Sequence, residues 1–143
     1  MNFELRNVKE SDFNWLYELR RQTMSKYIND SGDQFNLETQ SKRIMKEYTS
    51  IKIVRSDNKD IGMFKAKRNL DKWEIIQIQL LPEYQHMGIG TKLIQNLQEE
   101  ASQQGMALFL SVLKVNPAKG LYERLGFEIV AEKEKSYTMR YSA

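Results

Sequence analysis

The sequence predicts a mixed α/β fold in a single domain spanning residues 1–143. The first observation behind this prediction is the stretch Trp73–Lys92, which reads as a strand, a glycine-bearing loop and a helix. The second is the nearly all-apolar run Met106–Leu113, which is typical of a strand that is covered on both faces and parallel to its neighbour. Together the two segments make a βαβ unit, for which a right-handed crossover is expected.

The first part of the chain is expected to form one strand and two helices. Phe3–Val8 alternates in the manner of a strand, and Ser11 is a suitable cap for a helix that runs to about Tyr27. A second helix is predicted over Leu37–Tyr48. Between the helices, Asn29–Asp33 is polar and turn-forming, so we expect it to be the most flexible segment.

The rest of the chain alternates strands with helices and ends in a hairpin. Turn-forming residues separate the apolar runs, and proline and glycine mark the two ends of a short helix. The predicted elements are, in order, strands over Ile51–Arg55 and Ile61–Lys67, the strand, loop and helix of Trp73–Lys92 and beyond, the strand Met106–Leu113, a helix between Pro117 and Gly126, and a hairpin of Phe127–Ala131 and Ser136–Tyr141.

Composition limits the class of protein. With 41% hydrophobic residues the chain can bury one core, and without cysteine it has no disulfide, thiolate metal site or cysteine nucleophile. No apolar run approaches the roughly 18 residues of a membrane span, and the first residues contain no apolar signal segment, so we expect a soluble cytoplasmic protein without membrane contact. A net charge of +3 suits an anionic ligand but is too weak to indicate nucleic acid.

The loop before the central helix has a chemistry of its own. The first N–H groups of a helix lack internal partners and lie at the positive end of its dipole, which suits a phosphate. Gly88 and Gly90 would let such a ligand approach the backbone closely. The loop is neither a dinucleotide fingerprint, because Leu93 replaces its third glycine, nor a P-loop, because the spacing differs.

Two motifs in the second half of the chain resemble those of the GNAT acetyltransferase superfamily. Gln85, Gly88 and Gly90 match its acyl-CoA loop, which reads Gln or Arg, two residues, Gly, one residue, Gly or Ala. Asn116, followed by a short helix with Tyr122 in the pattern Tyr-x-x-x-Gly-Phe, resembles its second signature. The resemblance implies the GNAT fold, with a strand, two helices, three strands, a helix, a strand, a helix and two strands, in which the central parallel strands splay apart.

The resemblance also implies an activity. Such proteins transfer an acetyl group from acetyl-CoA, the acyl-donor cosubstrate, to a primary amine by direct attack and without a metal. Dimers are common among them, although nothing in this sequence locates an interface. We therefore expect Tyr122 as the acid that protonates the thiolate, with an amphipathic core tyrosine as the alternative, and a backbone N–H near Leu80 as the donor to the thioester oxygen. The coenzyme is expected to contact Leu80, Leu81, Asn116 and Tyr122 along pantetheine and the reacting group, and Gln85, His86, Met87, Gly88, Ile89, Gly90 and Thr91 around the pyrophosphate.

On the acceptor side, Arg20 and Tyr27 share the apolar stripe of the first helix. Either the Arg20 head reaches solvent or pairs with a buried carboxylate, or it binds an anionic group of the substrate. Gln77, a further candidate substrate contact, stands where many relatives carry a glutamate base. Strand alternation predicts that Glu74, a potential substitute, points to the opposite face. His86, the only histidine, is interpreted as a loop contact without a catalytic role, and no metal cluster is indicated.

Without a carboxylate base, the acceptor should have a low pKa. A lysine-like amine near pKa 10.4 is only about 0.1% neutral at pH 7.4, equivalent to roughly 4 kcal/mol, whereas an α-amine near 7.8 loses less than about 1 kcal/mol. The leading hypothesis is an N-acetyltransferase that acts on a small-molecule amine, and an amine that carries an anionic group is favoured if Arg20 faces the pocket. The alternatives are an acyl-CoA-binding module without catalysis and an enzyme that acetylates a protein terminus or a lysine side chain.

Overall fold

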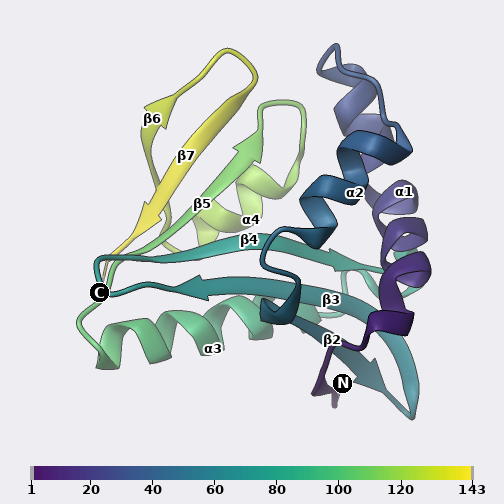
Figure 1. The fold of residues 1–143 in the computed structure, drawn as a ribbon. Coiled ribbons are helices and arrows are strands. Elements are labelled where there is room, and N and C mark those ends of the chain that lie inside the picture. The colour runs from purple at the N-terminus through teal and green to yellow at the C-terminus, as the bar shows by residue number, and fades with distance from the viewer. Residues whose placement is uncertain (1, 143) are drawn as a thin grey trace.

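The computed structural model describes residues 2–142, and its centre is a seven-stranded mixed sheet (Figure 1). The strands are β1 (Glu4–Asn7), β2 (Ile51–Ser56), β3 (Lys59–Arg68), β4 (Trp73–Leu80), β5 (Leu108–Leu113), β6 (Glu128–Glu132) and β7 (Ser136–Tyr141). They lie in the order β1-β2-β3-β4-β5-β7-β6, and β4 and β5 are parallel whereas their other neighbours are antiparallel. The predicted mixed α/β class and the parallel central pair are confirmed.

Helices cover both faces of this sheet. The helices are α1 (Phe13–Asp30), α2 (Leu37–Met45), α3 (Ile89–Gln103) and α4 (Ala118–Arg124), with short 3-10 helices η1 (Glu10–Asp12), η2 (Tyr48–Ser50) and η3 (Pro82–Tyr84). Helices α1 and α2 lie against one face, and α3 and α4 lie against the other (Figure 1). The order of elements is the predicted one.

Each face has its own hydrophobic core. An apolar stripe of α3 is buried against β2 to β5, with Leu93, Ile94, Leu97 and Ala101 each at most 3% exposed. On the other face, Leu16 and Leu19 of α1 and Ile44 of α2 pack against β2 and β3. The spacing of three and four residues between these apolar positions is what places them on one side of each helix.

One extra residue interrupts β4. The register pairs Lys65 with Gln77 but Ala66 with Ile75, so Ile76 has no partner of its own on β3 and forms a β-bulge. A bulge shifts the alternation of side chains by one position. The faces to which residues of β4 point therefore cannot be counted through Ile76 by simple alternation.

Several boundaries differ from the prediction. Helix α1 begins at Phe13 and not near Ser11, because the preceding residues form a 3-10 turn, and it continues to Asp30 through part of the predicted flexible segment. Helix α2 ends at Met45, three residues early, where its last carbonyl groups accept hydrogen bonds from the buried Lys65. These differences arise from contacts between elements that local sequence does not contain.

Candidate active site

The loop between β4 and α3 presents a row of free backbone amides. Gly88 caps α3 with φ of 84° and His86 also has positive φ, at 63°, so the chain turns twice before the helix begins. Within residues 2–142, none of the amides from His86 to Thr91 donates to another group of the protein. Free amides at a helix N-terminus, where the dipole is positive, are suited to an anion such as a pyrophosphate.

Gln85 ties this loop to the end of β4. Its side-chain Nε2 donates to the carbonyl oxygen of Leu80 at 3.0 Å, and its backbone N–H donates to Pro82 at 3.2 Å. The exposed segment His86–Gly88 is therefore fixed at both ends, by Gln85 on one side and α3 on the other. All seven residues predicted to contact the pyrophosphate, from Gln85 to Thr91, lie in the continuous stretch from the end of η3 to the first turn of α3.

Strands β4 and β5 separate after a short paired stretch. Three register pairs join them in the described part of the chain, and the last is Ile75 with Leu110. Beyond that pair, β5 continues alongside β7 to Leu113, and β4 continues alongside β3 to Leu80. The predicted splaying of the parallel strands thus begins next to the Ile76 bulge.

The separated part of β4 directs backbone groups toward the opening. The N–H of Leu81 donates to the carbonyl of Ile61 on β3 at 2.8 Å. Because hydrogen-bonded and non-hydrogen-bonded pairs alternate in an antiparallel ladder, Leu80, paired with Gly62, and Ile78 point their N–H and carbonyl groups away from β3. Ile78 therefore offers its N–H and carbonyl on the β5 side and Leu80 offers its N–H, whereas the carbonyl of Leu80 accepts from Gln85 and the N–H of Leu81 is occupied.

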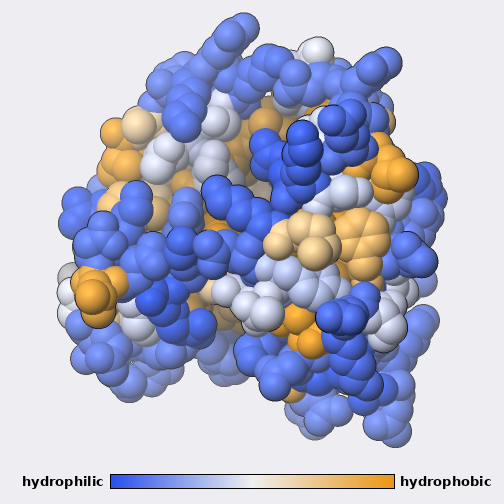
Figure 2. Space-filling model, in the orientation of Figure 1, coloured by the Kyte–Doolittle hydropathy of each residue, from blue (hydrophilic) through white to orange (hydrophobic). Residues whose placement is uncertain are grey.

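A cavity of about 870 Å³ occupies the space where the strands diverge. Tyr122 and Asn116 line it from the side of α4, and Arg20 lines it from α1 on the opposite face of the sheet, so the cavity connects the two faces. Figure 2 shows this part of the surface hollowed between the β5–β7 region and the α1–α2 region, with hydrophilic side chains along its border. Other lining residues are Met24, Ile28, Asp33, Gln34, Asn36, Thr39, Gln40, Lys42, Arg43, Lys46, Ile75, Ile76, Gln77, Ile78, Gln79, Leu110, Ser111, Val112, Leu113 and Ser136.

Tyr122 lies on α4 with 8% of its surface exposed and packs edge-on against Phe127, with ring centroids 5.9 Å apart. Burial raises the pKa of its phenol to about 12. Within residues 2–142 the hydroxyl makes no hydrogen bond, and its oxygen atom is not fully enclosed by the protein. The phenol is therefore a protonated donor that is accessible from the cavity.

Asn116 contacts the start of α4 and also lines the cavity. Its Oδ1 accepts from the N–H of Ala118 at 2.9 Å, which satisfies a free amide at the start of α4. The residue also lines the cavity, and the Nδ2 group remains as a donor there. Asn116 thus positions the helix that carries Tyr122.

Arg20 is buried, with 5% of its surface exposed. Its Nε donates to Oε1 of Gln40, and within the described chain it forms no ion pair with a carboxylate. Burial and the positive charge of nearby Arg43 lower the pKa of Arg20 to about 10. A buried carboxylate partner therefore does not account for this arginine, and its Nη groups, which are not fully enclosed, are open to the cavity that the residue lines. Tyr27, predicted to accompany it, is not among the residues that line the cavity, whereas Met24 and Ile28 are.

The prediction that Glu74 and Gln77 point to opposite faces is wrong. On β3, Lys65 and Lys67 are two residues apart and therefore point to the same face of the sheet. Gln77 is the partner of Lys65 and Glu74 is the partner of Lys67, so these two residues of β4 share that face as well. The bulge at Ile76 absorbs one residue and brings both side chains to the α1–α2 face. Gln77 lines the cavity there, and Glu74 does not.

Sequence reasoning missed the role of Lys65. This lysine is 0% exposed, and its Nζ donates to the carbonyls of Arg43, Ile44 and Lys46 at 3.0, 3.1 and 2.7 Å. Burial, followed by the charge of Arg20, lowers the pKa of Lys65 to about 8. The lysine fixes the end of α2 over the cavity. In the sequence, the position of this charged residue between Phe64 and Ala66 in an apolar strand was the feature that could have indicated its burial.

Sequence reasoning also missed an ion pair between two loops. Lys135, in the turn between β6 and β7, contacts Asp33, in the connection between α1 and α2, with Nζ and Oδ1 2.9 Å apart. Asp33 and Ser136 both line the cavity. The pair therefore joins the two sides of the cavity. Because its residues are 102 positions apart, no local sequence pattern could predict the contact.

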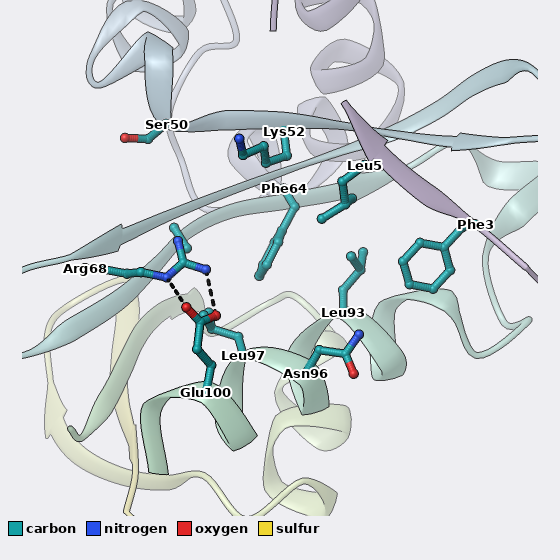
Figure 3. A pocket seen from close by; sticks show the side chains of 11 residues that line it. Phe3, Leu5, Ser50, Lys52, Phe64, Arg68, Leu93, Asn96, Leu97 and Glu100 are labelled. Atoms are coloured by element: carbon teal, nitrogen blue, oxygen red, sulfur yellow. Dashed lines mark hydrogen bonds and ion pairs between the residues drawn. The ribbon is translucent and has the colours of Figure 1, made fainter. Parts of the chain in front are cut away.

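A second pocket of about 160 Å³ lies on the α3 face, away from these residues (Figure 3). Phe3, Leu5 and Phe64 point into it, and the ion pair of Arg68 with Glu100 borders it. None of the predicted site residues lines this pocket. Among residues 2–142 no group of three or more His, Cys, Asp or Glu side chains is placed to hold a metal. No helix in the same range has the length and apolar character needed to cross a membrane.

A mixed sheet whose two central parallel strands diverge, with a helix starting soon after one of them, is the fold of an acyltransferase. Residues 47–129 match the family model described as an acetyltransferase (GNAT) domain. The chain belongs to the GNAT family of acetyltransferases, and it is an acyltransferase enzyme.

The chain is similar to N-acetyltransferases from several organisms. The [ribosomal protein bS18]-alanine N-acetyltransferase of Haemophilus influenzae is 27% identical over 137 residues, which cover 91% of this chain and 84% of that protein. Among solved structures, the PaiA N-acetyltransferase of Thermoplasma acidophilum in complex with coenzyme A is 20% identical, with a TM-score of 0.75 and full coverage of both chains. The ribosomal-protein-S18-alanine N-acetyltransferase of Escherichia coli is 19% identical, with a TM-score of 0.72 and coverage of 99% and 94%.

Proposed function

We propose that this enzyme transfers an acetyl group from acetyl-CoA to a primary amine of a small molecule by direct attack, with Tyr122 as the general acid. The observation that carries the proposal is the cavity between β4 and β5, which joins the Tyr122 side of the sheet to the Arg20 side. A thioester placed in this opening would meet an amine that arrives from the opposite face. Such positioning is a large part of what an enzyme contributes to a two-substrate reaction.

The coenzyme would lie along the route that the free backbone groups define. The amides from His86 to Thr91 would hold the pyrophosphate, and the backbone of Ile78 would bond the pantetheine arm, which would run past Leu80 in place of a neighbouring strand. Asn116 would face this arm through its Nδ2 group. The N–H of Leu80 is in a suitable direction to donate to the thioester oxygen as charge develops on it.

The chemical steps balance without an enzyme-bound intermediate. The amine nitrogen attacks the thioester carbon, the new C–N bond forms, and the C–S bond breaks as the thiolate leaves. Tyr122 donates a proton to the departing sulfur, and the proton lost by the nitrogen restores the phenol directly or through water. One proton moves in total from nitrogen to sulfur.

The raised pKa of Tyr122 determines when its proton can move. A thiol with an ordinary pKa near 8.5 is a stronger acid than this phenol, so full proton transfer to sulfur would be uphill by about 5 kcal/mol. Transfer is favourable only in concert with the loss of the nitrogen proton. Until that moment, Tyr122 stabilises the leaving sulfur as a hydrogen-bond donor.

Among residues 2–142, one carboxylate lines the cavity, that of Asp33, and it is paired with Lys135. Gln77 lines the cavity and its Nε2 donates to the carbonyl of Arg43 at 3.5 Å, a long contact, and its amide cannot take a proton. Glu74 shares that face but lies outside the cavity. This favours an acceptor whose amine is largely neutral near pH 7.5, such as an α-amine.

A second candidate function is acetylation of a protein N-terminus. The similarity to a ribosomal-protein alanine N-acetyltransferase supports it, and the preference for an α-amine agrees with it. The ion pair of Asp33 with Lys135 favours a small acceptor instead, because it joins the two loops on either side of the cavity. A polypeptide would need these loops to part.

An acceptor panel with a thiol-release readout tests both candidates. The panel contains small α-amines and peptides with a free N-terminus, including one that begins with alanine. Every acceptor is assayed with the wild-type enzyme and with the variants Asp33→Asn and Asp30→Asn. Asp30 pairs with Lys26 within α1 and does not bridge the loops, so it is the matched control. We expect turnover of small amines by wild type and a gain with peptides only in Asp33→Asn. A peptide preferred by wild type would favour the second candidate, and no thiol release with any amine would overturn the proposed transfer.

A further inference from the structure

We infer that the acceptor carries a carboxylate, held by Arg20 and Arg43 at the end of the cavity that lies on the α1–α2 face. This inference rests on the proposed acetyl transfer and names the class of its substrate. The amine would point toward the opening between β4 and β5, and the carboxylate would point toward α1 and α2.

Arg20 has donors without acceptors. A guanidinium has five N–H groups, and the Nε group of Arg20 donates to Gln40. Within residues 2–142 the remaining groups at Nη1 and Nη2 have no hydrogen-bond partner, and neither atom is fully enclosed, so they are open to the cavity that this largely buried residue lines. A buried charge without a counterion is unfavourable, and the planar edge formed by two N–H groups fits the two oxygens of a carboxylate.

The charges around Arg20 have the same sign. Four basic residues of the described chain line the cavity, and one acidic residue, Asp33, is already paired with Lys135. Arg43 is close enough to lower the pKa of Arg20. These basic residues are Arg20, Lys42, Arg43 and Lys46.

The coenzyme does not account for this positive lining. None of the loop residues from Gln85 to Thr91 lines the cavity, and their free amides belong to α3 on the other face of the sheet. Arg20, by contrast, lies on α1 and contacts Gln40 of α2. The positive end of the cavity therefore faces whatever enters from the α1–α2 side, which is the acceptor.

Neutral polar side chains extend the same surface. Gln77 and Gln79 of β4 are each 7% exposed and line the same cavity as the two arginines. Amide side chains can bond both an amine and a carboxylate oxygen without adding charge. The lining thus combines a phenol at Tyr122 and amides with the cations of Arg20 and Arg43.

The first experiment uses wild-type enzyme and acceptors that differ only in the carboxylate. Amino acids with a terminal amine are compared with alkylamines of the same chain length, dipeptides are compared with their amides, and an aminoalkyl phosphate is included, all by thiol release from acetyl-CoA. We expect at least a 10-fold higher kcat/KM for the carboxylate member of a pair. Equal values would overturn the inference while leaving acetyl transfer intact, and preference for the phosphate would replace the carboxylate by another anion. Absence of release with every amine would instead overturn the proposed function.

The second experiment changes the arginines. Arg20→Gln and Arg43→Gln should raise KM for the carboxylate acceptor by roughly 10- to 100-fold while KM for acetyl-CoA and for the matched alkylamine stays the same. Arg43 is exposed, so its variant should fold even if the buried Arg20 variant does not. Arg21→Gln removes the neighbouring charge, which pairs with Glu18 outside the cavity, and should change nothing. Equal losses for the carboxylate acceptor and the alkylamine would overturn the inference.

Discussion

The proposed coenzyme loop lies at the α3 face of the sheet, whereas the proposed acceptor cavity passes through the sheet to the α1–α2 face, and the two are built in different ways. The loop is a single run of seven residues, Gln85–Thr91, that offers backbone amides fixed by one helix start and one side-chain bond to Leu80. The cavity is lined by side chains of α1, α2, β4, β5 and α4, which come together only in the folded sheet.

This difference determines what each region tolerates. A site made of backbone groups depends on φ and on glycine, so most side-chain changes in the loop should leave it working. A site made of buried side chains depends on identity and on charge. Two buried cations belong to this region: Arg20 lines the cavity, and Lys65 fixes the end of α2 beside it. Substitutions that change the binding of the coenzyme but not of the acceptor, or the reverse, can therefore test whether the two regions have separate roles.

The largest expected effect lies where the two regions meet. Tyr122→Phe should lower kcat by about 100- to 10,000-fold, because the proton donor to sulfur is lost, with the Kd of acetyl-CoA unchanged by calorimetry. Tyr141→Phe is the matched control, since Tyr141 also packs against Phe127, at 5.8 Å between centroids, but lies outside the cavity. Unchanged turnover in Tyr122→Phe would remove this residue from the mechanism.

The buried cation of the acceptor face should affect stability through pH. The pKa of Lys65 is lowered in the fold to about 8, so between pH 8 and the ordinary value near 10.5 the unfolded chain binds more protons. Stability should therefore rise with pH across that window, by up to about 2 kcal/mol between pH 7.5 and 9.5. Urea titrations of wild type and Lys65→Met at both pH values measure the contribution. The same pH dependence in both proteins would show that Lys65 does not cause it.

The coenzyme face should respond to backbone strain. Gly88 and Gly105 flank α3, both have positive φ, and a Cβ at either would meet no atom within 4 Å. Alanine at either position should cost about 1 kcal/mol of stability. Only Gly88→Ala should also weaken acetyl-CoA binding, by roughly 10-fold, because it moves the free amides. Equal affinities of the two variants, measured by calorimetry, would contradict this placement of the pyrophosphate.

The smallest expected effect concerns the bond that ties the loop to β4. Gln85→Met removes the donor to Leu80 and should weaken acetyl-CoA binding about 5-fold, in keeping with one hydrogen bond worth about 1 kcal/mol. Gln95→Met, on the exposed side of α3, should bind as wild type does. A loss of acceptor affinity without a change in coenzyme affinity would assign Gln85 to the other region.

The sequence was most informative where structure is local. The motif from Gln85 to Gly90 and the order of helices and strands predicted the fold, because both depend on short-range turn chemistry and hydrophobic period. The arginine in the stripe of α1 was also visible as an exception, and Arg20 is indeed buried beside a cavity. These observations located the region in which to look for an acceptor.

The remaining features needed the register of the sheet. The bulge at Ile76 reverses side-chain alternation, which is why Glu74 and Gln77 share a face. Tyr27 lies on the predicted side of α1 but outside the cavity, because a helical wheel gives direction and not distance. The contact of Asp33 with Lys135 joins residues that no local pattern relates.

The short pairing of β4 with β5 has a mechanical consequence. Three register pairs, all near Trp73–Ile75, join the two strands in the described chain, and beyond them β4 has unpaired backbone on that side. A pantetheine arm laid along Ile78 and Leu80 would act as a missing strand segment and close the sheet. The donor would then be part of the scaffold as well as a reactant, and each departure of coenzyme A would loosen the seam through which the acetylated product must leave.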